Sequence, residues 1–86
     1  MTVEKLQADL LSNSEKLVFG SERSLKFLKN GKLEKIYLSN NCKADLREEI
    51  QRHSKDVEIV ELGVLNTEAG VVCKKTFPIT VIGLLK

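Results

Sequence analysis

Residues 17–38 read Leu17-Val-Phe-Gly20-Ser-Glu-Arg-Ser-Leu-Lys-Phe-Leu-Lys-Asn-Gly31-Lys-Leu-Glu-Lys-Ile-Tyr-Leu38, and this segment sets the architecture of the chain. A short apolar run enters Gly20, the shape of a buried strand. Ser21 is the predicted N-cap of a helix through Leu28, and Gly31 is placed to form a left-handed cap after its C-terminal end. The apolar run Ile36 to Leu38 then predicts a second strand. The segment therefore predicts a strand, a helix and a strand in succession.

The same alternation continues on both sides of this segment. Apolar spacing and breakers predict helices over residues 3–11, 45–53 and 66–72, the last capped by Asn66 or Thr67, and strands over 57–62 and 79–85. Alternation of this kind predicts a central, largely parallel sheet with helices on both faces. Functional residues of such sheets sit at strand ends and helix starts, here 20–21, 39–41 and 63–67.

Length and composition place the chain among small globular proteins. Its 86 residues, 42% of them hydrophobic and 30% charged, predict one core and a single domain over residues 1–86. The longest apolar run, within residues 79–85, is far short of the roughly 20 residues that span a bilayer. The N-terminus lacks the apolar stretch of a signal peptide. We expect a soluble, cytoplasmic protein without membrane contact.

Cysteines and enzyme motifs give little sign of chemistry. Cys42 and Cys73 lie 31 positions apart without a CxxC pair, and His53 is the only histidine. This pattern predicts buried thiols, with neither a zinc site nor a disulfide framework. Motifs for nucleotide binding or nucleophilic catalysis are missing from the sequence. We therefore expect no enzyme, no catalytic residue, no metal, no cofactor and no small-molecule substrate.

Charge is unevenly distributed, although the net charge of +2 is too small to diagnose nucleic-acid binding. Residues 20–35 carry five basic side chains against two acids, and residues 69–86 carry three lysines and no acid. Residues 44–62 are reversed, with six acids against three bases. The asymmetry indicates one face for a polyanion and another for solvent.

Two segments carry candidate contacts to RNA. The helix start after Gly20 presents Glu22, Arg23 and Lys26, and the planar fork of Arg23 suits guanine edges or phosphates. In the segment from Asn66 to Phe77, the aromatic ring follows two lysines, where an unstacked base could lie on it. The residues alone leave two alternatives open, an ordinary capped surface helix and a core phenylalanine.

Three blocks of the sequence resemble one protein family. They are Leu17 to Gly20 with Leu25, Lys26, Leu28, Lys29, Gly31 and Lys32; Asn41-Cys42 with Asp45 to Ile50; and Glu68, Gly70, Lys75 and Phe77. In this order they resemble the archaeal and eukaryotic ribosomal proteins called L-thirty-e, within the L-seven-A-e superfamily of kink-turn RNA binders. The resemblance implies a three-layer α/β/α sandwich with a four-stranded mixed sheet and about four helices.

The resemblance also implies a site and a partner. Folded RNA containing a kink-turn, in ribosomal RNA of the large subunit, is the expected partner, and neighbouring ribosomal proteins are further candidates. Carried over by position, the family's contacts fall on Gly20, Lys26, Asn41, Glu68, Gly70, Lys75 and Phe77, with Phe77 stacking on a base. Together with the helix start and the second segment, the candidate RNA-binding residues are Gly20, Ser21, Glu22, Arg23, Lys26, Asn41, Asn66, Glu68, Gly70, Lys75 and Phe77.

The sequence departs from the family at several of these places. Glu22 and Arg23 occupy positions where superfamily members often carry Asn-Glu, and Lys74 replaces a family glycine. Two alternatives to a ribosomal role therefore stay open. One is a kink-turn protein of another ribonucleoprotein, such as a guide-RNA modification complex or ribonuclease P. The other is an interaction module of the same fold that has lost its affinity for RNA.

Overall fold

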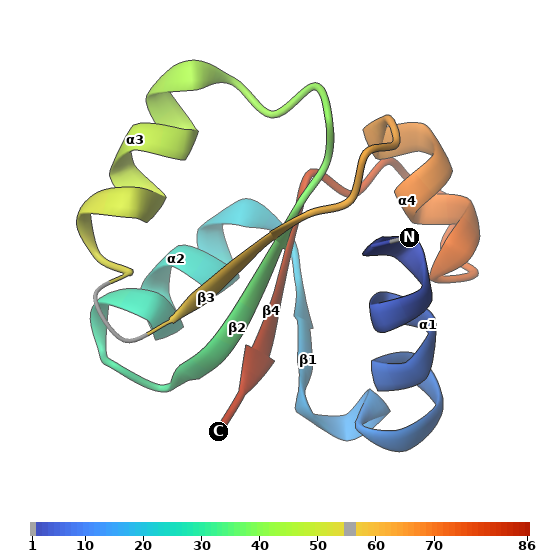
Figure 1. Cartoon of the computed structure of the whole chain (residues 1–86), viewed down its shortest axis with the longest axis horizontal. Coiled ribbons are helices and arrows are strands. Elements are labelled where there is room, and N and C mark those ends of the chain that lie inside the picture. The colour runs from blue at the N-terminus through green and yellow to red at the C-terminus, as the bar shows by residue number, and fades with distance from the viewer. Residues whose placement is uncertain (1, 55–56) are drawn as a thin grey trace.

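The computed structural model describes residues 2–54 and 57–86 and contains four α-helices and four strands in those ranges (Figure 1). In chain order they are α1 Thr2–Ser12, the 3-10 helix η1 Ser14–Lys16, β1 Leu17–Phe19, α2 Ser21–Lys29, β2 Leu33–Leu38, α3 Ala44–Arg52, β3 Glu58–Glu61, α4 Asn66–Val72 and β4 Val81–Leu85. All the helices and strands expected from the sequence are present, and η1 is additional. Lys55 and Asp56, two charges of the acidic interval, lie outside the described residues.

The sheet has the strand order β1-β4-β2-β3 and is mixed. Only the β2–β3 pair is parallel, whereas β4 lies antiparallel to both β1 and β2. The expectation of a largely parallel sheet is therefore wrong, and the mixed sheet implied by the family resemblance is confirmed. The apolar runs did not reveal strand direction, because a strand buried on both faces shows the same sequence pattern whether it is parallel or antiparallel to its neighbours.

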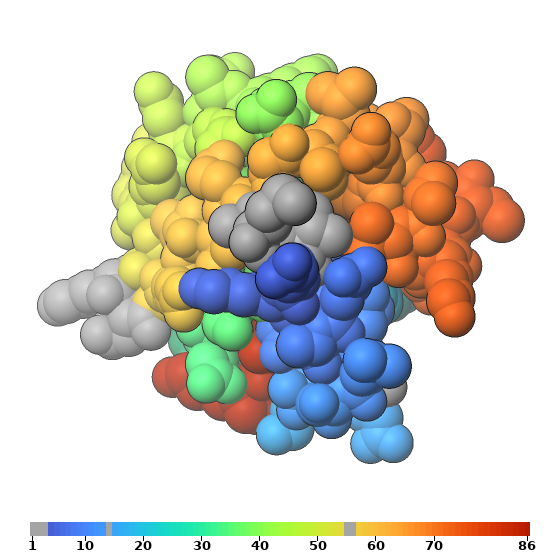
Figure 2. Space-filling model, turned by 45° about the vertical axis from the view of Figure 1, so that its right-hand side comes forward, coloured from blue at the N-terminus to red at the C-terminus, as the bar shows by residue number. Residues whose placement is uncertain are grey.

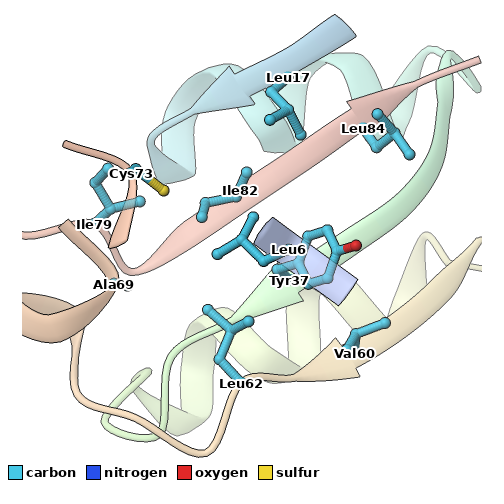
Figure 3. Close-up of a cluster of buried hydrophobic side chains, with 10 residues drawn as sticks. All are labelled: Leu6, Leu17, Tyr37, Val60, Leu62, Ala69, Cys73, Ile79, Ile82 and Leu84. Atoms are coloured by element: carbon cyan, nitrogen blue, oxygen red, sulfur yellow. The ribbon is translucent and has the colours of Figure 1, made fainter. Parts of the chain in front are cut away.

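Two helices cover each face of the sheet, which gives three layers (Figure 1). On one face α1 and α4 pack over a cluster that includes Leu6, Tyr37, Ala69 and Ile82 (Figure 3). On the other face α2 and α3 bury a second cluster around Leu28, Leu33, Ile36 and Ile50. The three-layer α/β/α sandwich is confirmed.

Helix α1 is fastened to the sheet by a polar contact inside the first cluster. The hydroxyl of Tyr37, which is fully buried on β2, donates a hydrogen bond to the carboxylate of Asp9. Asn13 donates to the same carboxylate at 3.2 Å, and the ammonium of Lys35 lies 3.6 Å from it. Burial by itself would raise the pKa of Asp9, but the hydrogen bonds and the charge of Lys35 outweigh it and hold the pKa below its ordinary value.

Two helices end in the same backbone motif with different residues at its strained position. Behind α2, Gly31 has a φ of 69°, its N–H bonds to Leu28, and the N–H of Lys32 bonds to Phe27. Behind α4, Lys74 takes the equivalent place with a φ of 58°. The predicted left-handed cap at Gly31 is confirmed, whereas Lys74 accepts a conformation that favours glycine.

The two cysteines are free and buried, as predicted. Burial raises the pKa of the Cys42 and Cys73 thiols, so both stay protonated at neutral pH. Over residues 2–54 and 57–86, no group of three or more His, Cys, Asp or Glu side chains is placed to hold a metal ion. No helix in that same part of the chain has the length and apolar character needed to cross a membrane.

Candidate nucleic-acid interface

The interface begins where β1 turns into α2 at Gly20. Gly20 has a φ of 108° and a ψ of 150°, a backbone conformation that residues other than glycine rarely adopt. It occupies the N-cap position, and its N–H bonds to the carbonyl of Val81 at 3.0 Å. Ser21 is the first helical residue, so its predicted role as N-cap is wrong, and no side chain takes over that role. The N-cap residue therefore offers no side-chain acceptor to the first backbone N–H groups of α2.

The cations at the start of α2 are exposed. Arg23 and Lys26 lie on the solvent side of the helix, and Glu22 is exposed beside them. Within the described part of the chain, neither cation lies within ion-pair distance of a carboxylate, whereas Lys29 one turn further on pairs with Glu49 of α3 at 3.1 Å. Arg23 and Lys26 therefore remain available to an external anion.

The second part of the interface follows α4. Phe77 exposes 52% of its surface, so the alternative of a core phenylalanine is wrong. Its backbone is held close to α4, because a Cβ atom added to Gly70 would collide with the carbonyl oxygen of Phe77. The N–H of Lys75 also bonds to the carbonyl of Gly70 at 2.9 Å. Gly70 is thus a packing residue beneath the Phe77 segment and is itself buried.

The two parts meet at a cleft of about 610 Å³. Its lining includes the candidate residues Arg23 and Lys26 from α2, and Lys75 and Phe77 from the segment after α4. Since these segments lie about 50 positions apart in the sequence, only the fold brings them together. The cleft combines three cationic side chains with an aromatic ring, a combination that suits the phosphates and bases of a nucleic acid.

Sequence reasoning missed two aromatic residues of the cleft, Phe19 and Phe27. Phe19 ends β1, and the ammonium of Lys75 lies 4.8 Å from the centre of its ring, within the range of a cation–π interaction. Phe27 follows Lys26 on α2 and also packs against the second core cluster. The position of Phe19 directly before Gly20 could have identified it, because it ends the strand that leads into α2.

The remaining candidate residues do not line the cleft. Asn41, in the loop after β2, and Asn66, at the start of α4, bind each other through their side chains at 3.1 Å. Neither Asn66 nor Thr67 is the N-cap of α4, which is Leu65, so that prediction is wrong. Glu68 is exposed on the first turn of α4. Gly20, Ser21 and Glu22 lie at the start of α2, next to the residues that do line the cleft.

Fold and cleft together define a small α/β/α protein with a cationic, aromatic cleft along the β1 edge of its sheet. Comparison with known sequences then places it: the chain belongs to the Ribosomal protein L7Ae/L30e/S12e/Gadd45 family, whose profile matches residues 2–86. The resemblance inferred from the sequence is thereby confirmed. Membership in a family with this description also supports the prediction that the chain is not an enzyme.

Individual relatives are archaeal. The large ribosomal subunit protein eL30 of Sulfolobus acidocaldarius is 34% identical over 77 residues, which cover 87% of this chain and 74% of that protein. The protein of the same name from Methanocaldococcus jannaschii is 31% identical over 72 residues, or 81% of this chain. This chain spans 66% of the length of the Methanocaldococcus protein.

Solved structures support the fold. A protein of unknown function from Bacillus halodurans superposes with a TM-score of 0.73 at 20% identity, covering 99% of this chain and 82% of that one. A 15.5 kD RNA binding protein from Giardia lamblia superposes with a TM-score of 0.66 at 22% identity, covering 99% of this chain and 69% of that one. At such identities the likeness concerns the fold alone.

Proposed function

We propose that this chain is an RNA-binding structural component of the large ribosomal subunit that recognises a kink-turn in ribosomal RNA. In a kink-turn, tandem sheared G·A pairs and a flipped-out nucleotide fold two stems into a sharp bend. The archaeal relatives are ribosomal proteins by name and the Giardia protein is an RNA binding protein by name, and both names support an RNA partner. The cleft is the observation that carries the proposal.

The cleft fits one unstacked nucleotide together with the backbone around it. The exposed face of Phe77 offers a stacking platform for a base, and stacking of this kind tolerates every base because each has a π-face. Arg23, Lys26 and Lys75 line the same cleft and supply positive charge for phosphates. The flipped-out nucleotide of a kink-turn would then lie on Phe77, with the bent backbone near α2.

The start of α2 would meet the G·A pairs. The backbone N–H of Ser21 and the fork of Arg23 are donors for base edges or phosphates, whereas the N–H of Gly20 is taken by the carbonyl of Val81. Glu22 would accept a hydrogen bond from a guanine amino group, because a carboxylate beside phosphate is otherwise repelled. Asn41, in the loop after β2, and Asn66 and Glu68, on the first turn of α4, lie at the same end of the sheet as Gly20.

The setting follows from the same proposal. The protein would act as a single RNA-binding domain on the cytoplasmic ribosome, without cofactor, metal or small-molecule substrate. Neighbouring ribosomal proteins would contact the surface that RNA leaves free. A role in another ribonucleoprotein would use the same cleft and would differ only in the RNA that supplies the kink-turn.

One observation favours a second candidate, an interaction module without RNA affinity. Leu11 on α1 and Val71 on α4 expose 89% and 74% of their surfaces. A groove of about 420 Å³ lies between these helices, lined partly by Leu10, Leu11 and Val72. Figure 2 shows this side of the molecule, with α1 and α4 next to each other. This groove is lined mostly by apolar residues and shares no lining residue with the cationic cleft, so the fold is compatible with both uses.

Binding to two hairpins separates the candidates. The purified protein is titrated against a kink-turn hairpin and against the same hairpin with its G·A pairs replaced. Kink-turn recognition predicts preference for the first hairpin, and an interaction module predicts weak, equal binding to both.

A further inference from the structure

Asn41 is tied by its side chain to the first residue of α4. Its carbonyl oxygen accepts a hydrogen bond from the backbone N–H of Asn66 at 3.0 Å. It also accepts one from the hydroxyl of the buried Ser39 at 3.0 Å. In return, the amide nitrogen of Asn41 donates to the side-chain oxygen of Asn66 at 3.1 Å. Two of these three hydrogen bonds join the loop after β2 to the start of α4, and the third holds the Asn41 side chain against Ser39.

These bonds occupy the atoms that Asn41 would need to read a base. An asparagine that recognises an adenine edge uses its oxygen as an acceptor and its NH₂ group as a donor at the same time. A carbonyl oxygen has two lone pairs, and both are taken by Ser39 and Asn66. Base readout by Asn41 would thus require that this connection be broken.

The connection supplies what α4 lacks. The first N–H groups of a helix need acceptors from outside the helix, and the N-cap residue Leu65 has no side-chain acceptor. Asn41 therefore caps α4 from a loop 25 positions earlier in the chain. A cap of this kind fixes where the helix starts and in which direction it leaves the sheet.

Helix α4 in turn positions Phe77. The carbonyl of Asn66 accepts a hydrogen bond from the N–H of Ile79 at 3.0 Å, and the side chain of Asn66 donates to Thr80 at 3.4 Å. At the other end of the helix, Gly70 contacts the backbone of Phe77 itself. The segment carrying Phe77 is thus held at both ends of α4, and a shift of the helix start would move the ring.

We infer that Asn41 is a positioning residue, which caps α4 and thereby orients Phe77 towards the cleft, and that it does not read RNA through its own amide. This inference rests on the proposed function only for the role of Phe77. The hydrogen-bond relay from Asn41 through Asn66 to Ile79 exists without RNA and is testable without it.

The first test uses the free protein and amide hydrogen exchange. In Asn41→Ala, the amides of Asn66 and Ile79 should exchange about tenfold faster, the loss expected from one helix cap, while Ile82 in β4 keeps its protection. Asn40→Ala is the matched control, since this neighbouring asparagine is exposed, and it should leave all three amides unchanged. Unchanged exchange at Asn66 and Ile79 in Asn41→Ala would overturn the inference.

The second test is a double-mutant cycle on the affinity for a kink-turn hairpin. Asn41→Ala should weaken binding about fivefold in the wild-type background and less than about twofold in a Phe77→Ala background, because its effect passes through the ring. Equal losses in the two backgrounds would mean that Asn41 contacts RNA by itself, and would overturn the inference.

A further variant belongs to the exchange experiment. Asn41→Asp keeps the acceptor for the Asn66 N–H and should restore the protection of the Asn66 amide that Asn41→Ala loses. Failure to do so would also contradict the inference.

The two tests separate the inference from the proposed function. If the wild-type protein does not prefer the kink-turn hairpin, the proposed function fails. The exchange experiment still decides whether Asn41 positions α4.

Discussion

Gly70 and Phe77 touch through their backbones, since a Cβ on Gly70 would collide with the carbonyl oxygen of Phe77 and lie 3.6 Å from the Cα of Pro78. The helix passes so close to the following segment that only a residue without a side chain fits. This contact fixes how far the aromatic ring lies from α4. The candidate interface therefore depends on glycine at position 70.

Gly70→Ala should be destabilising. Alanine gains about 1 kcal/mol of helix propensity over glycine. The backbone of Phe77 and Pro78 must move to admit the new methyl group, however, and overpacking of this kind costs about 1 to 3 kcal/mol. We expect a net loss in the free energy of unfolding, measured by urea denaturation. Val71→Ala, on the exposed side of the same helix, is the control and should change stability by no more than about 0.5 kcal/mol. A stabilised Gly70→Ala protein would contradict the close contact.

Phe77→Ala should separate stability from binding. Because half of the Phe77 surface is exposed, its removal should cost much less stability than the roughly 3 to 5 kcal/mol typical of a buried phenylalanine. Loss of one aromatic–base stack should weaken binding to a kink-turn hairpin by about 1 to 3 kcal/mol. Denaturation and gel-shift titration of the same protein give both quantities. Unchanged RNA affinity would remove Phe77 from the interface, and Leu11→Ala serves as the control for an exposed apolar side chain.

Lys74→Gly should stabilise the protein. Lys74 holds a φ of 58° at the end of α4, where a side chain costs roughly 1 kcal/mol relative to glycine. Part of the gain is offset because glycine makes the unfolded chain more flexible. We expect a higher midpoint of urea denaturation in Lys74→Gly. Lys74→Ala removes the same charge but keeps the Cβ, so it should show no such gain; equal behaviour of the two variants would argue against strain at this residue.

The hydrogen bond from Tyr37 to Asp9 should make stability depend on pH. The pKa of Asp9 in the folded protein lies below its ordinary value of 3.8, so the unfolded chain binds the proton more readily. The stabilisation is therefore complete above about pH 5 and is lost as the pH falls through the folded pKa. Tyr37→Phe should cost about 1 to 2 kcal/mol at pH 7 and less at about pH 3, measured by urea denaturation. An equal cost at both pH values would show that the carboxylate is not involved.

The sequence predicted the helices and strands better than their arrangement. The short helix at 66–72 and the cap at Gly31 were predictable because Pro78 and a left-handed glycine are local signals. The direction of β4 was not, because burial on both faces leaves no trace of direction in the sequence. Ser21 was wrongly predicted as the N-cap, because its neighbour Gly20 takes that position with a positive φ that other residues rarely adopt.

The candidate site shows the same division. Arg23, Lys26, Lys75 and Phe77 could be nominated from their residue types and from the family resemblance, and the fold brings all four to one cleft. The pairing of Asn41 with Asn66 could not be foreseen, because it depends on how close two loops come in space. Phe19 was missed for a related reason: a strand-end aromatic looks like core until the neighbouring Lys75 is seen over its ring.

The most direct test of the account is a gel-shift titration of the purified protein against a kink-turn hairpin and the same hairpin with its G·A pairs replaced. The account predicts at least about tenfold tighter binding to the intact kink-turn, equivalent to about 1.4 kcal/mol. Equal and weak binding to the two hairpins would contradict it.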